Sequence, residues 1–412
     1  MIKPRQLTIW MLAFISATLP SYVIRYRLGP VPTSVLENLI LLTAAAYAWT
    51  LWSERRLPAA RTWLDIPIVL LLLSGIVGVV VAPDHTRALG IYRAYFVEAI
   101  AIYYIAVDVV RTKDDLRRVL LIAAIGSSAF AIGQIGRFGM AEVQHSIEID
   151  NGPAFLNTSA NAVAMFLEPP LAFAAGLALF GSSSREKLVA VLTLGLVLIA
   201  IVLTLSRASY LAMALLAVVV VVSIPRPRWR LAAVAVLGVA AVVAAQLPII
   251  NQRLGSFAHS VQLRWSIYGQ ALRMLSQRPI TGAGISGFPI RVAPFRPGSQ
   301  EVELYPHNLW LTTWSELGII GLLAFAAIFF GLLWQGWRAL RSAEGTYRAV
   351  IWGATGALLL YLVHGMFDSP YWKNDLSVEF WLLAALMVIG VRGARAQSLA
   401  GGAEVQSRSS SD

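Results

Sequence analysis

Three basic side chains, His307, Arg207 and Arg264, are the strongest candidates for chemistry in this sequence. His307 stands where a polar segment broken by proline ends and a long apolar run begins. An imidazole takes or gives a proton near neutral pH, so it can act as a general base on a hydroxyl. A guanidinium can bind a phosphate through two parallel hydrogen bonds. These residue types therefore predict a general base beside a site for an anion, with phosphate as the natural anion.

Each of these residues also has a purely structural interpretation. His307 could cap the helix that follows it, Arg264 could lie on a solvated helix face, and Arg207 could extend its charge from an apolar helix to the membrane surface. Against this, Arg207 lies in a short turn between two apolar runs, and an arginine at such depth usually faces a cavity and has a partner. Positive charge near His307 is expected to lower the pKa of its imidazole and keep it neutral.

Other polar residues are candidates for supporting roles. Asp368 ends a predicted span, where it can orient His307, bind sugar hydroxyls or cap a helix. Glu316 follows His307 by about 900° of helical rotation and about 13.5 Å of rise, so on an unbroken helix the two do not touch. We therefore interpret Glu316 as a structural residue of the bundle. Further candidates are Asn308, Arg278 and Arg93, and the sequence leaves open whether Arg273, Arg278 or Arg291 shares the role of Arg264.

The composition indicates a membrane protein. Of 412 residues, 58% are hydrophobic and only 13% are charged, whereas a soluble domain carries about 25% charged residues. The net charge of +11 does not indicate nucleic-acid binding, because the charges lie in short loops and form no basic domain. The absence of cysteine excludes disulfides, thiolate metal sites and a cysteine nucleophile. The five histidines are scattered, so we expect neither a metal nor a cofactor.

The apolar runs predict an all-α integral membrane protein, a polytopic bundle of about twelve transmembrane helices of ~20 residues each. The first run is interpreted as a retained span, because no convincing cleavage site follows it. The predicted spans are 7–24, 33–52, 64–82, 91–109, 116–137, 153–180, 187–206, 208–224, 230–248, 308–335, 347–367 and 376–394. Residues 1–396 are therefore expected to form one membrane domain, and the Ser- and Gly-rich residues 397–412 a disordered cytoplasmic tail.

Lysine and arginine in the loops predict the orientation. With the N-terminus in the cytoplasm, every inside loop is basic, although Arg25 and Arg27 in the first outside loop are exceptions. The turn at Arg207, the long loop 249–307 and the loop around Asp368 then lie on the outer face. This orientation places the candidate base and both arginines on one side of the membrane.

The loop 249–307 is too long to be an unstructured connection. Residues 259–277 are predicted to form an amphipathic helix inside it, ended by Pro279 and a glycine run at 282–287. The apolar residues at helical spacing are Val261, Trp265, Tyr268, Leu272 and Leu275.

The order of short motifs resembles the O-antigen ligase and O-antigen polymerase superfamily. The motifs are Ser206-Arg207, Arg264-Trp265, Arg278-Pro279-Ile280-Thr281-Gly282-Ala283-Gly284, Pro306-His307-Asn308 with Glu316 and Gly318, and Phe367-Asp368-Ser369-Pro370. The resemblance implies a metal-independent glycosyltransferase with a GT-C-like fold, working at the periplasmic face of the bacterial inner membrane. It implies that Arg207 and Arg264 hold the pyrophosphate of an undecaprenyl-pyrophosphate-linked glycan donor. His307 would then activate the acceptor hydroxyl, and direct displacement would invert the anomeric centre.

The acceptor stays open at the level of sequence. A ligase transfers the glycan to the lipid A-core, whereas a polymerase transfers it to another lipid-linked glycan. A third branch of the resemblance transfers to protein hydroxyls, but no added soluble domain of the expected kind is visible. A transporter of lipid-linked sugars should show internal repeats and broken helices near the membrane midplane, and a purely structural assembly subunit would not need the three basic residues on one side.

Overall fold

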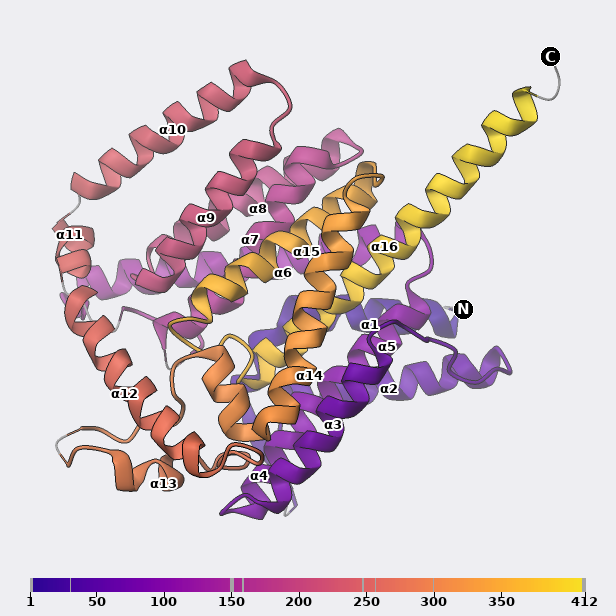
Figure 1. Ribbon diagram of the computed structural model, residues 1–412. Helices are drawn as coiled ribbons and strands as arrows, with labels where there is room; N and C mark the ends of the chain where they lie inside the picture. Colours follow the sequence, from indigo (N-terminus) through magenta and orange to yellow (C-terminus); the bar gives the residue numbers. More distant parts are fainter. Residues whose placement is uncertain are drawn as a thin grey trace.

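The computed structural model describes residues 3–29, 31–148, 152–157, 159–246, 248–255, 257–298 and 300–409 (Figure 1). Long apolar runs become helices because a helix satisfies its own backbone hydrogen bonds where no water is present. One departure from helix is an antiparallel hairpin of β1 (Arg25–Leu28) and β2 (Val31–Ser34), which the sequence did not predict.

The helices follow one another with short connections over most of the chain. The first half contains α1 (Pro4–Thr18), the 3₁₀ helix η1 (Leu19–Val23), α2 (Val35–Ser53), α3 (Asp65–Val80), α4 (His85–Tyr92), the π-helix η2 (Arg93–Glu98), α5 (Ala99–Val109), α6 (Lys113–Val143), α7 (Ala160–Phe180) and α8 (Ser184–Val202). The second half contains α9 (Arg207–Ser223), α10 (Pro227–Gln246), α11 (Pro248–Gly255), α12 (Phe257–Gln277), α13 (Phe288–Arg291), the 3₁₀ helix η3 (Ala293–Phe295), α14 (Leu309–Ala339), α15 (Gly345–His364) and α16 (Asn374–Ser409).

Eight helical segments of the described chain are long and apolar enough to cross a membrane. They are Pro4–Val23, Val35–Ser53, His85–Val109, Lys113–Val143, Ala160–Phe180, Leu309–Ala339, Gly345–His364 and Asn374–Leu399, and each coincides with a predicted span. The other four predicted spans coincide with α3, α8, α9 and α10. Of these, α3 and α9 are apolar but have only 16 and 17 residues.

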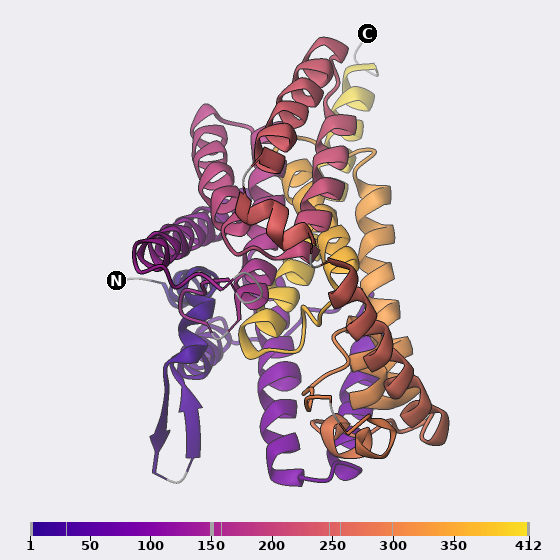
Figure 2. The ribbon, with the colours of Figure 1, turned by 90° about the vertical axis from the view of Figure 1, so that its left-hand side faces the viewer.

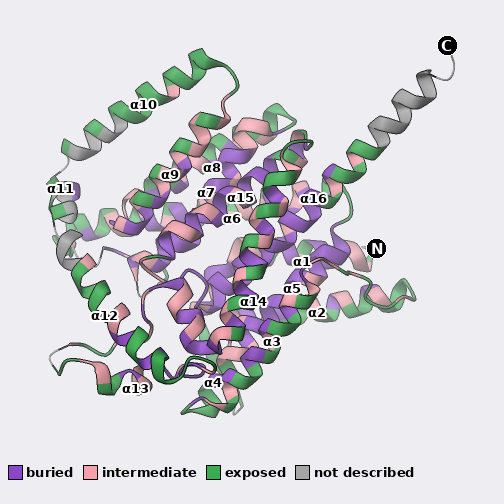
Figure 3. Cartoon of the chain, in the orientation of Figure 1, coloured by how far each residue is buried: buried purple, intermediate pink, exposed green. Residues whose placement is uncertain are grey.

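The core lies where α7, α15 and α16 meet. α7 packs against α15 and α8, α16 against α5 and α15, and α14 against α3. The side chains of α15 and of the first half of α16 are mostly buried, whereas the described part of α10 is mostly exposed (Figure 3). Of the main candidates, Arg207 begins α9, which packs against α15, and Arg264 lies on α12. His307 and Asp368 lie in the segments before α14 and after α15.

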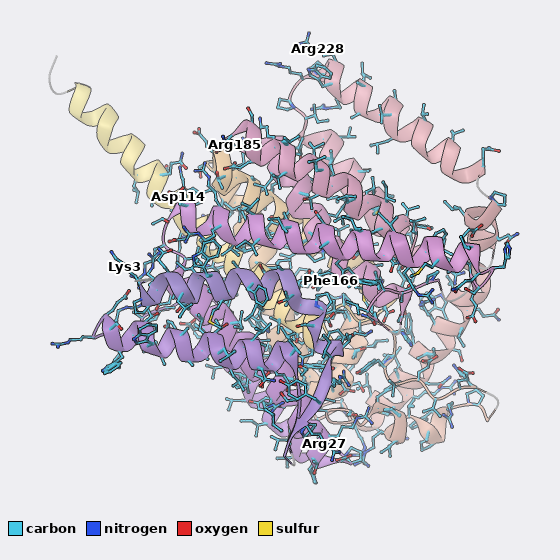
Figure 4. All side chains as sticks on the ribbon, turned by 180° about the vertical axis from the view of Figure 1, so that it is seen from behind. Lys3, Arg27, Asp114, Phe166, Arg185 and Arg228 are labelled. Carbon is cyan, nitrogen blue, oxygen red and sulfur yellow. The ribbon has the colours of Figure 1, made fainter. Side chains whose placement is uncertain are left out.

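The two ends of the bundle differ in the segments they carry. The hairpin and the α12–α13 segment lie at one end, and the C-terminal part of α16 lies at the other (Figure 2). Lys3, Asp114 and Arg185 lie at one end of their helices, and Arg27 lies far from them (Figure 4). The residues of the predicted inside loops thus lie apart from Arg27, which belongs to the first predicted outside loop. Which side of the membrane each set of loops faces stays a prediction.

The loop 249–307 contains α11, α12, α13 and η3, as expected for a connection of that length. α12 confirms the predicted helix, but the predicted apolar face was partly wrong. Trp265 is 68% exposed and Leu272 is 49% exposed. The helix instead buries Ile267, Ala271, Met274 and Leu275 against Ala283, Phe288 and Val292, because their apolar face is the one that meets the segment folding back beneath the helix.

At the C-terminal end of the chain, α16 continues to Ser409. The tail predicted from residue 397 onward overlaps this helix, and its last residues, 410–412, lie outside the described part of the chain.

Candidate functional site

Arg264 reaches the turn that follows α15. Its Nε donates a hydrogen bond to the carbonyl oxygen of Phe367 at 2.8 Å. One turn further along α12, the Tyr268 hydroxyl donates to the carbonyl oxygens of Met366 and of His307, the latter at 3.1 Å. Burial raises the pKa of the Tyr268 hydroxyl, so this residue remains a donor at neutral pH. α12 thus joins the segment before α14 to the segment after α15.

The C-terminal end of α12 is fixed by the glycine run against a kink in α14. Gly318 interrupts the helical backbone with φ of +70°, and a Cβ there would lie 1.9 Å from the carbonyl oxygen of Ile280. Gly282 has φ of +66°, and its Cβ would lie 2.3 Å from the carbonyl oxygen of Ser315. Both approaches require glycine. The buried Glu316 carboxylate accepts a hydrogen bond from the backbone of Ser286, which fits its predicted structural role.

His307 lies in the turn before α14 and does not cap the helix. The N-cap is Asn308, whose Oδ1 accepts hydrogen bonds from the backbone of Trp310 and Leu311, each at 3.0 Å. His307 has φ of +52°, in the left-handed region. A residue other than glycine adopts this conformation at a cost and usually where the surroundings demand it. The capping interpretation of His307 is therefore wrong, since the neighbouring side chain fulfils that role.

Both ring nitrogens of His307 contact a carboxylate. Nδ1 lies 3.3 Å from Oδ1 of Asp368, and Nε2 lies 2.9 Å from Oε2 of Glu303. Asp368 is held in turn by the backbone N–H of Ser369 at 2.8 Å and by the side-chain amide of Asn161 at 3.2 Å. We call Glu303, His307, Asp368 and Arg264 the His307 site.

The pKa of His307 moves opposite to the sequence-based expectation. Burial lowers it, but hydrogen bonds with Asp368 and Glu303 and their negative charges outweigh burial and raise the pKa to about 10. The expected depression of this pKa by nearby arginines was wrong, because the two carboxylates in contact with the ring raise it. Burial raises the pKa of Asp368, but the hydrogen bond and charge of His307 hold it well below its usual range. The hydrogen bond from His307 also lowers the pKa of Glu303. With both carboxylates in contact, this raised pKa makes His307 an imidazolium at neutral pH.

Sequence reasoning missed Glu303. The residue lies four positions before His307, but the intervening segment is not helical and contains Pro306, so no periodic pattern marks the pair. Its acidic character in the outer loop, close to the predicted base, was the available signal.

Arg207 is the first residue of α9, and Ser206 caps that helix. Two residues later, the Ser209 hydroxyl lies 3.4 Å from Nδ1 of His364, the last residue of α15. The backbone N–H of Asp368 donates to the carbonyl oxygen of His364 at 2.9 Å. The start of α9 and the turn that carries Asp368 therefore meet at the same end of the bundle.

The remaining candidates lie away from His307 or serve elsewhere. Asn308 caps α14 and donates to the carbonyl oxygen of Met366 at 3.3 Å. Arg93 pairs with Glu37 at 2.9 Å and with Glu98 at 3.2 Å, within the π-helix. Arg278 is exposed beyond the end of α12, about 20 Å along the helix from Arg264. Arg273 is also exposed, whereas Arg291 is partly buried in α13, so Arg264 is the arginine of this group with a described contact to the turn of Asp368.

Within the described ranges, no group of three His, Asp or Glu side chains is arranged to hold a metal ion.

The comparison with protein families gives one match. Residues 192–326 match the O-antigen ligase family. The matched segment runs from α8 into α14 and contains Arg207, Arg264, Glu303 and His307. A search of curated proteins finds no match. The apolar helices and the family match together indicate a multi-pass membrane protein. Members of the matched family are glycosyltransferase-like ligases and polymerases. Over residues 192–326, the chain is thus similar to the O-antigen ligase family.

Proposed function

We propose that this protein transfers a glycan from undecaprenyl pyrophosphate to a sugar hydroxyl of the lipid A-core, as an O-antigen ligase. The observation that carries the proposal is the contact of His307 with Asp368. Arg264 reaches the same turn after α15 that carries Asp368. A histidine base with a carboxylate at Nδ1, and with the Arg264 guanidinium at the turn that carries this carboxylate, suits attack by a hydroxyl on a glycosyl pyrophosphate. The family match supports the same reaction class.

The proposed step is a direct displacement. The acceptor hydroxyl gives its proton to Nε2 of His307, while its oxygen forms a bond to the anomeric carbon of the donor. The bond from that carbon to the pyrophosphate oxygen breaks, and the electron pair leaves with the pyrophosphate, which inverts the anomeric centre. Asp368 at Nδ1 stabilises the imidazolium that forms, as a carboxylate does for a histidine base in other transferases and hydrolases.

In this proposal, Arg207 and Arg264 bind the pyrophosphate and stabilise the charge that develops on it. Pyrophosphate is already a good leaving group, so fixed positive charge and proton removal account for most of what the enzyme must supply. We further propose that the reaction needs no metal ion, since the guanidinium groups provide the charge.

The proposed setting is the periplasmic face of the bacterial inner membrane, with residues 1–396 as a single GT-C-like catalytic unit. The basic loops at the end opposite to the hairpin support this orientation. The transporter and the structural subunit remain less suitable, because neither needs a histidine set between two carboxylates.

The experiment supplies purified protein with a lipid-linked glycan and two acceptors, lipid A-core or a second lipid-linked glycan, with and without a chelator. Glycan attached to lipid A-core supports the ligase, whereas extension of the lipid-linked glycan alone identifies a polymerase. No transfer to either acceptor, with movement of the lipid-linked glycan across vesicles, would overturn the proposal in favour of a transporter. Loss of transfer in the chelator, restored by magnesium or manganese, would overturn the metal-independent step.

A further inference from the structure

Neither ring nitrogen of His307 is open to an acceptor hydroxyl, because each contacts a carboxylate. Asp368 occupies Nδ1 at 3.3 Å and Glu303 occupies Nε2 at 2.9 Å. A general base must present an unprotonated nitrogen within hydrogen-bond reach of the hydroxyl. One of the two carboxylates therefore has to leave before His307 can act as a base.

The surroundings of the two carboxylates differ. Asp368 is 16% exposed in its side chain and is fixed by Ser369 and Asn161. Glu303 is 31% exposed and lies on a segment without helix or strand, between residues 300 and 308. A carboxylate on such a segment can turn toward solvent without disturbing a packed helix, whereas Asp368 is anchored at the end of α15.

We propose that Glu303 is a positioning residue that occupies Nε2 of His307 in the resting enzyme and yields this position to the acceptor hydroxyl. The proposal rests on the proposed role of His307 as general base. While Glu303 contacts Nε2, the imidazole is held in the orientation that attack requires, but this nitrogen cannot accept a proton. The acceptor thus completes the base by displacing the carboxylate.

The protons balance in this sequence of steps. In the resting site, His307 carries a proton on each nitrogen. Glu303 takes the Nε2 proton as it turns away and releases it to water, which leaves a neutral ring whose Nδ1–H still faces Asp368. The acceptor hydroxyl then gives its proton to Nε2 as its oxygen attacks the donor. After the product leaves, the imidazolium regains Glu303 as its partner.

Several charged and titratable groups lie on the elements around His307, and those that do not contact its ring interact with Asp368 or Glu303. Glu303 and Tyr305 belong to its own segment, Asp368 and His364 come from the turn and end of α15, and Arg264 and Tyr268 come from α12. Of these, Glu303 and Asp368 contact the ring nitrogens. Removing the charge of Glu303 should therefore lower the pKa of His307 while the other groups stay in place.

The pH profiles separate the free enzyme from the acceptor complex. kcat/KM for the acceptor reports the free enzyme, and kcat reports the complex. In the parent, the pH profile of kcat/KM should have its midpoint at higher pH than the profile of kcat. The reason is that Glu303 still contacts Nε2 in the free enzyme and raises the pKa of His307 there. In Glu303→Gln the two midpoints should converge at lower pH. Each unit by which the pKa of His307 falls in the free enzyme should raise kcat/KM at pH 7 by about tenfold, since the neutral imidazole becomes about tenfold more abundant.

A measurement without turnover tests the contact directly. Diethyl pyrocarbonate reacts with neutral imidazole, and peptide mass spectrometry measures its adduct on His307. In the parent, this reaction should begin only at alkaline pH, whereas in Glu303→Gln and Glu303→Ala it should begin at least about one pH unit lower. Glu303→Asp keeps the charge and should stay near the parent. Glu301→Gln is the matched control, because Glu301 is an exposed carboxylate on the same segment.

The outcomes distinguish this inference from the proposed function. If both neutral variants at position 303 retain the parent's pH dependence of His307 modification, Glu303 does not hold Nε2 and the inference is wrong. Glu301→Gln shifting the dependence as far as Glu303→Gln would overturn it as well, because the effect would then be one of general charge. A fully active His307→Asn variant would instead refute the base role of His307, whichever way the position-303 variants behave.

Discussion

His364 and Glu168 form a fully buried pair, with Nδ1 of the histidine 2.7 Å from Oε1 of the glutamate. The pair joins the end of α15 to the middle of α7, and Ser209 of α9 lies 3.4 Å from the same nitrogen. These contacts hold α7, α9 and α15 together. His364 lies one helical turn before Asp368, and Ser209 lies two residues after Arg207. The contacts of His364 with Glu168 and Ser209 therefore fix where the start of α9, with Arg207, lies relative to the turn that carries Asp368.

Replacing His364 with alanine should destabilise the protein and reduce transfer. The change leaves the buried Glu168 carboxylate without this partner, at a cost of about 1–3 kcal/mol or more. Thermal unfolding in detergent measures the loss, and Glu142→Ala, at an exposed position of α6, is the control. A His364→Ala protein as stable as the control would show that the pair does not hold the helices.

His307 and Asn308 should separate catalysis from stability. His307→Asn, which tolerates the left-handed backbone, should lower the transfer rate by about 10²–10⁴-fold, the usual contribution of a general base. Asn308→Ala should instead lower stability by about 0.5–2 kcal/mol, because it removes the N-cap of α14. Transfer assays and thermal unfolding of both variants provide the comparison. An active but unstable His307→Asn would reverse the assignment.

Arg207→Lys and Arg264→Lys should each lower transfer by about 10- to 100-fold. A lysine keeps the charge but loses the paired hydrogen bonds to phosphate, and a hydrogen bond to a charged group contributes about 1.5–3 kcal/mol. Arg273→Lys, at an exposed position on α12, is the control and should transfer normally. Parent-like rates in both test variants would exclude these arginines from pyrophosphate binding.

Stability should depend on pH through His307. Its pKa is raised by the two carboxylates, from 6.5 to about 10 in the folded protein. A group with a raised folded pKa stabilises the fold fully below its unfolded pKa, and this contribution is lost as the pH rises through the folded pKa. The thermal midpoint of the parent should therefore decrease between pH 7 and pH 10 more than that of His307→Asn. Parallel curves for the two proteins would contradict the ion pairing.

The orientation can be tested with single cysteines, because the chain contains none. Val302→Cys lies at an exposed position of the long loop, and Leu57→Cys lies at an exposed position of a loop predicted to be cytoplasmic. An impermeant maleimide added to spheroplasts should label the first variant and should label the second only after permeabilisation. The opposite pattern would invert the predicted topology.

The sequence was sufficient for most of the helices, and it singled out His307, Arg207, Arg264 and Asp368 as candidates whose roles stay predictions. Apolar runs of span length have few alternatives to helix, and a proline followed by His307 and Asn308 marks a helix start. Pairings across long separations could not be predicted in this way. The contact of His364 with Glu168 joins residues 196 positions apart, and that of His307 with Glu303 depends on an irregular backbone. The buried face of α12 was misassigned because apolar residues recur at helical spacing on more than one side of this helix, so the pattern alone does not show which side packs against Ala283, Phe288 and Val292.

The contact between His307 and Asp368 also limits how the protein can be divided. The segment that matches the O-antigen ligase family ends at residue 326, before Asp368. On the other side, Asn161, which supports Asp368, lies before the segment begins. A graft or an excised fragment of 192–326 would carry the arginines and the histidine without the carboxylate at Nδ1. The proposed reactive centre therefore depends on the assembled chain, and two halves separated between α14 and α15 would have to reassociate to form it.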